Sequence, residues 1–240
     1  MITKRPAEQR GHANYGWLDT WHSFSFADYH DAEHMGWGPL RVINDDTVCA
    51  GRGFGTHGHR DMEIISVVLA GELAHQDNMG NGTTIRPGEV QRMSAGTGVM
   101  HSEFNPSPAQ AAHFLQIWIQ PAQRGGSPSY EQKTIAPSSS KGDWQVLASP
   151  DGRDGSVSIQ QDATLARRQV DAGQTIDLAL ASGRLGYLHL IAGTMVVGGT
   201  TVSATLNPGD GAKIAQEQRL SLRAESASDF LFFDLPDTNQ

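Results

Sequence analysis

The sequence predicts an all-β protein, built as a sandwich or a barrel, and three observations support this fold class. Glycine and proline are frequent, with 27 and 11 copies in 240 residues, which is more turn-forming residues than a helical protein tolerates. Short apolar runs recur between turn residues at a spacing typical of sandwiches and barrels. No long segment sustains the apolar period of a helix.

The expected strands are apolar, β-branched runs of about six residues that end near glycine or proline. In the first half of the chain the clearest ones are residues 64–69 and 114–119. In the second half the same pattern marks residues 186–191, 195–197 and 230–235. Both halves are therefore expected to consist of strands.

Residues 121–140 interrupt this pattern with three prolines, two adjacent glycines and five serines, a composition typical of a linker. We therefore predict an N-terminal domain over residues 1–122, a linker over 123–140 and a C-terminal domain over 141–240. A weak internal repeat relates the two domains, because LAG at 69–71 returns as IAG at 191–193. Two further turn-forming matches follow in the same order, so we predict a duplicated β-domain.

Charge and cysteine content exclude several classes of protein. The chain has 18 basic and 26 acidic residues, a formal charge of −8, which argues against direct binding to nucleic acid or to an anionic membrane. No apolar run is long enough to span a bilayer. Cys49 is the single cysteine, so no intrachain disulfide can form. Because residues 1–10 show no signal-peptide pattern, we expect a cytoplasmic protein.

Histidines concentrate in the first half of the chain, and two short motifs stand out among them. Residues 57–59 read His-Gly-His and residues 101–103 read His-Ser-Glu. Side chains two apart on a strand share a face, so each motif presents two ligands together. If the two strands are neighbours, three imidazoles and one carboxylate converge on a site for Fe(II), Mn(II), Ni(II) or Cu(II) with open positions. The alternative for either motif alone is a pair of surface side chains.

These motifs resemble those of the cupins, and the chain as a whole resembles the pirin family. Gly51, His57, His59 and Glu63 are close to the first cupin motif, and residues 88–101 are similar to the second. The segments that carry the pirin resemblance are GWLDTWHSFSFADYHD (16–31), LRVINDD (40–46), HGHRDMEI (57–64), MSAGTGVMHSE (93–103), QIWI (116–119) and FDLP (233–236). The resemblance implies a bicupin, with two jelly-roll type β-barrels packed face to face. It is strongest to bacterial pirins that are similar to quercetin 2,3-dioxygenases.

The resemblance also implies a ligand set for one divalent transition metal per chain. In pirins the metal lies on the positions that match His57, His59, His101 and Glu103, with Fe(II) as the first candidate and Mn, Ni, Cu or Zn as alternatives. Ordinary cupins use the glutamate of the first motif, which is Glu63 here. The pirin match favours Glu103 as ligand and catalytic proton acceptor, with Glu63 beside the site.

The activity that the resemblance implies is a metal-dependent dioxygenase that cleaves a flavonol-like aromatic substrate with O₂. The alternative is a metal-bearing, redox-sensitive regulatory protein that acts through a protein partner. A cupin whose metal is purely structural is disfavoured, because three histidines and one glutamate do not fill an octahedral metal.

The internal repeat predicts that the C-terminal domain has no metal ligands. It aligns His57 and His59 with Ala179 and Ala181. In the same way His101 and Glu103 align with Leu222 and Ala224, so an apolar interior with an inward-pointing Leu222 is expected.

Three other features have weaker interpretations. His30, Glu33 and His34 have the HxxEH spacing of some zinc peptidases, but no helical pattern surrounds them. The aromatic run from Trp17 to Tyr29 is expected to pack in the core, with lining of a flavonoid-sized cavity as the alternative. Cys49 is expected to be a small buried apolar residue rather than a nucleophile.

Overall fold

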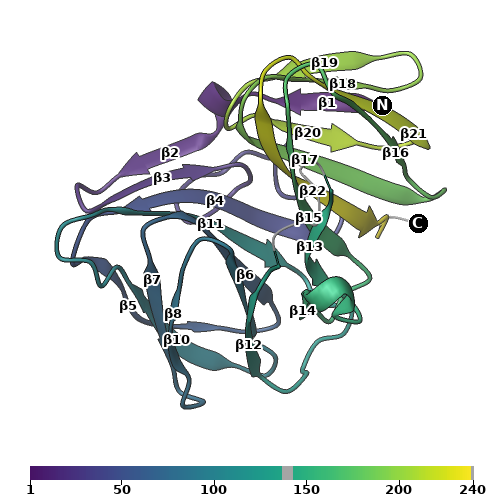
Figure 1. Ribbon diagram of the computed structural model, residues 1–240. Coiled ribbons are helices and arrows are strands. Elements are labelled where there is room, and N and C mark those ends of the chain that lie inside the picture. Colours follow the sequence, from purple (N-terminus) through teal and green to yellow (C-terminus); the bar gives the residue numbers. More distant parts are fainter. Residues whose placement is uncertain (137–142, 239–240) are drawn as a thin grey trace.

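The computed structural model describes residues 1–136 and 143–238, and these residues form an all-β structure, as predicted. Four sheets build two barrels, each from one seven-stranded and one four-stranded sheet (Figure 1). Among the described residues, the helical segments are two short 3₁₀ turns, Ala7–Gln9 and Arg153–Gly155. In this part of the chain there is no helix long and apolar enough to cross a membrane.

The N-terminal barrel contains the predicted strands 64–69 and 114–119. Its larger sheet has the order β12 (Ser129–Thr134), β9 (Glu89–Ser94), β6 (Glu63–Ala70), β11 (Ala112–Ile119), β4 (Leu40–Val48), β3 (Leu18–His22), β2 (Gly11–Asn14). Its smaller sheet has the order β5 (Gly53–His59), β10 (Val99–Phe104), β7 (Leu73–Asp77), β8 (Gly82–Ile85).

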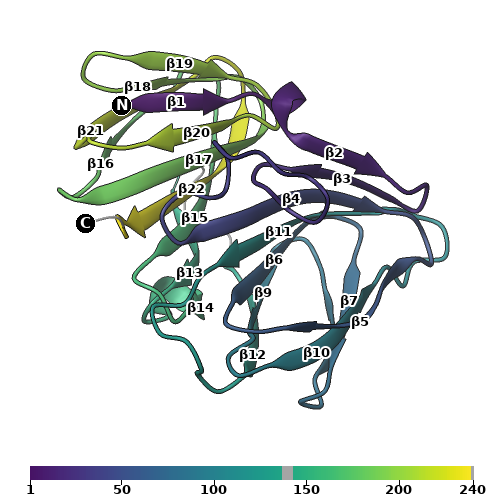
Figure 2. The ribbon, with the colours of Figure 1, turned by 180° about the vertical axis from the view of Figure 1, so that it is seen from behind.

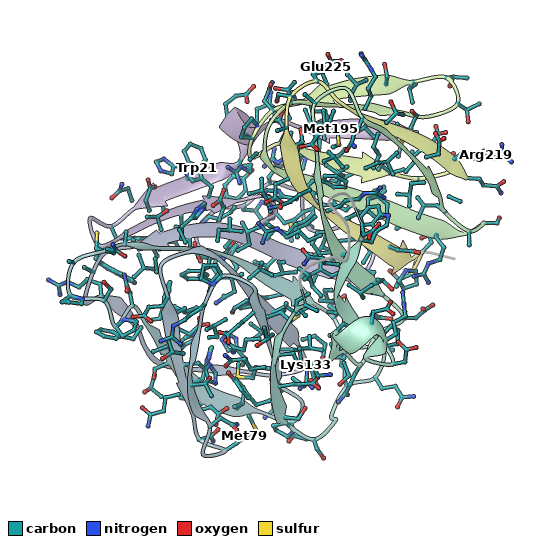
Figure 3. The ribbon with its side chains drawn as sticks, viewed as in Figure 1. Trp21, Met79, Lys133, Met195, Arg219 and Glu225 are labelled. Carbon is teal, nitrogen blue, oxygen red and sulfur yellow. The ribbon has the colours of Figure 1, made fainter. Side chains whose placement is uncertain are left out.

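The C-terminal barrel contains the three strands predicted in the second half of the chain. Its larger sheet has the order β1 (Ile2–Arg5), β20 (Gly211–Ile214), β17 (Arg184–Ala192), β22 (Ser228–Pro236), β15 (Thr164–Val170), β13 (Gln145–Ser149), β14 (Val157–Ser158). Its smaller sheet has the order β16 (Thr175–Ala179), β21 (Arg219–Ala224), β18 (Met195–Gly198), β19 (Ser203–Leu206). Figure 3 shows Met195 in this barrel, and its side chain is fully buried.

The two larger sheets pack face to face and share one hydrophobic core. Ile43 and Ile117 from the N-terminal barrel belong to the same buried cluster as Leu165 and Phe233 from the C-terminal barrel. Alternate residues on these strands point the other way, into their own barrels. Along β4, for example, Ile43 faces the shared core while Val48 packs inside the N-terminal barrel.

Two strands do not follow the predicted division of the chain. The N-terminal strand β1 pairs with β20 and therefore extends the sheet of the C-terminal barrel (Figure 2). Residues 129–134, within the predicted linker 123–140, form β12 and pair with β9 of the N-terminal barrel. The linker prediction is wrong for residues 129–134, because the glycines and prolines that suggested a linker lie before and after this strand. Residues 137–140 of that prediction lie outside the described residues.

Candidate metal centre

Three histidine side chains converge on the inner side of the smaller N-terminal sheet. Strands β5 and β10 are antiparallel neighbours, and His57 lies directly opposite His101. The Nε2 atom of His101 is 2.9 Å from Nε2 of His59 and 3.1 Å from Nε2 of His57. Imidazoles that bind one metal at right angles, with bonds of about 2.1 Å, have their nitrogens about 3 Å apart. The two distances from His101 therefore fit nitrogen ligands at adjacent positions of one octahedral ion.

Burial keeps two of these imidazoles neutral, which is the form that binds a metal. Desolvation, followed by the neighbouring His57, lowers the pKa of His59 to about 4. Desolvation and the adjacent imidazoles lower the pKa of His101 to about 2. Lone pairs on both rings are therefore available at neutral pH.

Glu103 lies on β10, two residues after His101, and its carboxyl group is buried on the His101 side of the cluster. One of its carboxylate oxygens, one nitrogen of His75 and one nitrogen of His101 lie within 4.8 Å of one another. Gln116 Nε2 donates a hydrogen bond to Glu103 Oε2 at 2.6 Å, and Ser66 Oγ lies 3.5 Å from Oε1. Burial raises the pKa of Glu103 to about 7, which suits a group that exchanges a proton near neutral pH.

His75 and Asp77 form a supporting network behind His101 that the sequence analysis missed. The Nδ1 atoms of His75 and His101 are 3.4 Å apart, and His75 Nε2 lies 3.2 Å from Asp77 Oδ2. The Asp77 carboxylate also accepts hydrogen bonds from the backbone N–H groups of Met79 and Asn81. Such outer hydrogen bonds set the orientation and tautomer of a metal-binding imidazole. The available signal was the i, i+2 spacing of His75 and Asp77 on a strand.

Glu63 does not lie beside the histidines, so this expectation is wrong. It occupies the face of β6 that it shares with Ile65, which packs in the core between the barrels. The next residue, Ile64, points into the N-terminal barrel instead. Glu63 Oε2 accepts a hydrogen bond from Ser94 Oγ at 2.7 Å. Strand alternation thus turns Glu63 towards the second barrel.

A cavity of about 420 Å³ opens beside the histidines and is lined by both aromatic and polar side chains. His59 and Phe26 each pack against the Trp118 ring, with centroid distances of 4.8 and 5.3 Å. Trp17 and Phe54 form a further edge-to-face pair at 5.3 Å. The polar part of the lining includes Thr20, His22, Asn44, Asp46 and Gln116, none of which the sequence analysis selected.

The aromatic run from Trp17 to Tyr29 divides between the two roles considered for it. Trp17 and Phe26 line the cavity, whereas Phe24 packs in the core between the barrels. Trp21 lies on the outer side of the N-terminal barrel, where His12 stacks on it at 4.0 Å (Figure 3). Residues of this run reach both places because β3 ends at His22 and the chain turns before Tyr29.

Two other sequence features are not part of the site. His34 Nδ1 lies 3.1 Å from Asp31 in a segment without helix, so the HxxEH spacing does not form a metal site there. Cys49 is exposed, which contradicts the expectation that it is buried. Its position directly after β4, in a turn, explains the exposure.

The corresponding place in the C-terminal barrel is filled by leucines. The strand order β16-β21-β18-β19 repeats β5-β10-β7-β8, and the matching tripeptides place Val197 where His75 stands. Strand pairing then sets Leu222, the partner of Val197, at the position of Glu103, the partner of His75. By the same registers, the counterparts of the four predicted metal ligands are Leu178, Leu180, Leu220 and Leu222.

The predicted alignment was therefore out of register, because each counterpart lies one or two residues before the predicted one. Ala179 and Ala181 are exposed rather than inside the barrel. Leu222 is fully buried and points inward, as expected. The error arose because the hairpins differ in length between the two copies. Equivalent residues of the two barrels are therefore not separated by a constant number of residues along the chain.

Comparison with known proteins agrees with this architecture. The Pirin family model matches residues 3–119, and the model for the quercetinase C-terminal cupin domain matches residues 146–235. Quercetin 2,3-dioxygenase of Escherichia coli K12 is 46% identical over 236 residues, covering 98% of this chain and 99% of that protein. The pirin-like protein of Caulobacter vibrioides is 40% identical over 235 residues, covering 98% and 99%.

A solved structure is similar over the same length. The crystal structure of the bacterial pirin YhhW from Escherichia coli in complex with nickel(II) has a TM-score of 0.92 and 45% identity, and it covers 99% of this chain and 100% of that one. The fold and the histidine cluster define the class of protein, a bicupin with a candidate metal centre in its N-terminal barrel. The chain belongs to the pirin family.

Proposed function

We propose that this chain is a metal-dependent dioxygenase that cleaves a flavonol-like substrate with O₂, of the quercetin 2,3-dioxygenase type. The observation that carries the proposal is the position of His57 and His59, which line an aromatic-walled cavity together with Glu103. A cavity of about 420 Å³ is within the range of small-molecule sites. The name of the Escherichia coli relative supports the same substrate class.

The proposed ligands of one divalent transition metal are His57, His59, His101 and Glu103. Imidazole and carboxylate donors suit the first-row ions, with Fe(II) as the first candidate and Mn, Ni, Cu or Zn as alternatives. The approach of His101 Nε2 to about 3 Å from Nε2 of His57 and of His59 supports this assignment. A metal bound there would supply Lewis acidity to an enol hydroxyl of the substrate while keeping positions open.

The protein side chains have separate tasks in this proposal. Glu103 accepts the proton of the substrate hydroxyl, since its carboxyl group lies in the cavity lining near His101. The hydrogen bond from Gln116 keeps its carboxyl group in place. Trp118, Phe26 and Phe54 supply flat apolar surfaces that accommodate aromatic rings and exclude water.

The test is oxygen consumption by the full-length protein after anaerobic loading with Fe(II), with parallel loadings of Mn, Ni, Cu and Zn. With quercetin added, we expect equal consumption of flavonol and O₂, with release of carbon monoxide. The His101→Ala variant should be inactive. The matched control is Ser102→Ala, a change at the next residue of the same strand, which should keep its activity. Metal-loaded protein that consumes no O₂ with any flavonol would overturn the proposal and favour the regulatory alternative.

A further inference from the structure

One wall of the cavity is polar, and it is formed by the neighbouring strands β3 and β4. Thr20 pairs with Asp46, and His22 pairs with Asn44, in the antiparallel register of these strands. All four side chains line the cavity. Leu18 and Val48, one step further along the same strand faces, belong to an apolar cluster of the barrel interior. The polar residues therefore form a patch within an otherwise apolar wall.

Within this patch, Asp46 is the side chain whose hydrogen bonding is incomplete. His22 Nδ1 and Asn44 Oδ1 form a hydrogen bond of 2.8 Å. Asp46 is 3% exposed, and its Oδ1 atom has no hydrogen-bond partner among the residues that the structure describes. A buried acceptor without a donor is unfavourable, so native proteins rarely retain one unless a ligand or water completes it.

The neighbouring residue Asp45 has hydrogen-bond partners that Asp46 Oδ1 lacks. Asp45 points to the opposite face of β4, where Arg10 Nη1 lies 3.3 Å and His113 Nε2 lies 2.7 Å from its oxygens. Desolvation and the nearby carboxylate of Glu103 raise the pKa of Asp46 to about 7, despite the hydrogen bond from Thr20. Asp46 is thus not a structural ion-pair residue, and it holds a buried, unpartnered oxygen in a side chain that forms part of the cavity lining.

We propose that Asp46 determines substrate specificity, with its free Oδ1 accepting a hydrogen bond from a second hydroxyl group of the aromatic substrate, away from the hydroxyl at the metal centre. This inference rests on the proposed function and narrows its substrate class to polyhydroxylated aromatics. A methoxy group or a hydrogen at that position of the substrate supplies no donor and leaves Asp46 unsatisfied. A site that must pair a buried polar group discriminates strongly against a ligand that lacks the partner.

The test compares quercetin with 3-hydroxyflavone, which keeps the enol hydroxyl and lacks the others. Binding is measured without turnover, by quenching of tryptophan fluorescence under anaerobic conditions, and kcat and KM are measured in air. Wild-type protein should prefer quercetin. Asp46→Leu, which keeps the branched shape of the side chain and has no acceptor, should weaken quercetin binding about tenfold or more and leave 3-hydroxyflavone binding unchanged. The change should fall on KM rather than kcat.

Two further variants keep the inference falsifiable. Asp46→Asn retains an acceptor and should restore part of the preference, even if Asp46→Leu does not fold. Asp45→Asn is the matched control on the opposite face of β4 and should keep the wild-type preference. An unchanged preference in folded Asp46→Leu, or in Asp46→Asn if the leucine variant does not fold, would mean that only water satisfies Oδ1 and would overturn the inference.

The binding assay separates this inference from the proposed function. If hydroxyl-dependent binding is lost in Asp46→Leu while no variant consumes O₂, the recognition role stands and the dioxygenase proposal fails. If flavonols are oxidised but Asp46→Leu keeps the wild-type preference for quercetin, the dioxygenase proposal stands and the role of Asp46 fails. Wild-type protein that binds neither compound would overturn the inference as well.

Discussion

At the residue scale, His101 takes part in two networks through its two ring nitrogens. Its Nε2 faces His57 and His59, and its Nδ1 faces His75, which in turn contacts Asp77. This arrangement leaves Nε2 free for a metal and anchors the opposite side of the ring. The site is therefore built by contacts from three strands, β5, β10 and β7.

Replacing His101 with Ala should remove most of the bound metal while the fold is kept, because the central nitrogen of the cluster is lost. Elemental analysis of purified protein, with circular dichroism to check folding, measures both effects. Ser102→Ala should retain wild-type metal content. Stoichiometric metal in folded His101→Ala protein would contradict the proposed ligand set.

The two glutamates should differ in their effects on catalysis. Glu103→Gln should lower kcat about 100-fold or more, because the proposed proton acceptor is lost. Glu63→Gln should leave kcat near wild type, because Glu63 faces Ser94 and the other barrel. Steady-state kinetics on the two metal-loaded variants measures the difference. A larger loss of kcat in Glu63→Gln would reverse the assignment.

His189 makes stability depend on pH through the barrel interface. It is 1% exposed, and desolvation followed by Arg10 lowers its pKa from 6.5 to about 4, against the opposing charges of Asp45 and Asp210. Between these two pH values the unfolded chain binds more protons than the folded one. The contribution of His189 is therefore complete above pH 6.5 and is lost as the pH falls towards 4.

The expected loss from His189 alone is at most about 3 kcal/mol. Urea unfolding of wild type and His189→Gln at several pH values measures it, and the variant should show a shallower decline below pH 6.5. Tyr187→Phe, another buried change at the same interface, should keep the wild-type pH dependence. A decline in His189→Gln as steep as in wild type would rule out this role.

At the scale of elements, the register between strands decides which side chains meet. The same four-strand arrangement holds His101 and Glu103 in one barrel and Leu220 and Leu222 in the other. The C-terminal barrel uses this position for apolar packing, since all of its counterparts are leucines. Its smaller sheet therefore contributes stability where the first barrel carries its candidate metal centre.

Truncating Leu222 to Ala should destabilise the protein by about 2–5 kcal/mol, the usual range for a buried leucine. Its side chain is fully buried inside the C-terminal barrel. Chemical denaturation measures the loss, and elemental analysis should show unchanged metal content in the folded variant. Ser221→Ala, on the exposed face of the same strand, should have little effect. Loss of metal in folded Leu222→Ala would show that the second barrel supports the site directly.

At the scale of the whole molecule, the two barrels are not independent units. Their larger sheets share a core, and β1 crosses from the N-terminus of the chain to the C-terminal barrel. Trp37 Nε1 adds a hydrogen bond to the Gly186 carbonyl oxygen across the junction at 2.9 Å. The N-terminal barrel alone would expose the apolar face that includes Ile43 and Ile117 to water.

A fragment of residues 1–122 should therefore be insoluble or unfolded. It lacks β12, leaves β1 without its partner β20, and exposes half of the shared core. Expression followed by size-exclusion chromatography and metal analysis tests this. A soluble fragment with bound iron and full activity would show that the C-terminal barrel is dispensable.

The sequence by itself determined the local features of this protein. Apolar runs identified the strands, and the period of two placed His57 with His59 and His101 with Glu103 on common faces. The resemblance to pirins added the pairing of two barrels. These features depend on residues close together in the chain or on a shared motif, so the sequence alone predicts them.

Only the tertiary structure decided which strands are neighbours and which face of each points inward. That choice turned Glu63 away from the histidines, brought His75 and Asp77 behind His101, and placed Asp46 in the cavity wall. It also assigned β1 and β12 to their barrels. Strand alternation fixes the side chains that share a face, but pairing between distant segments depends on how whole sheets bury their apolar faces, and no local pattern in the chain specifies that.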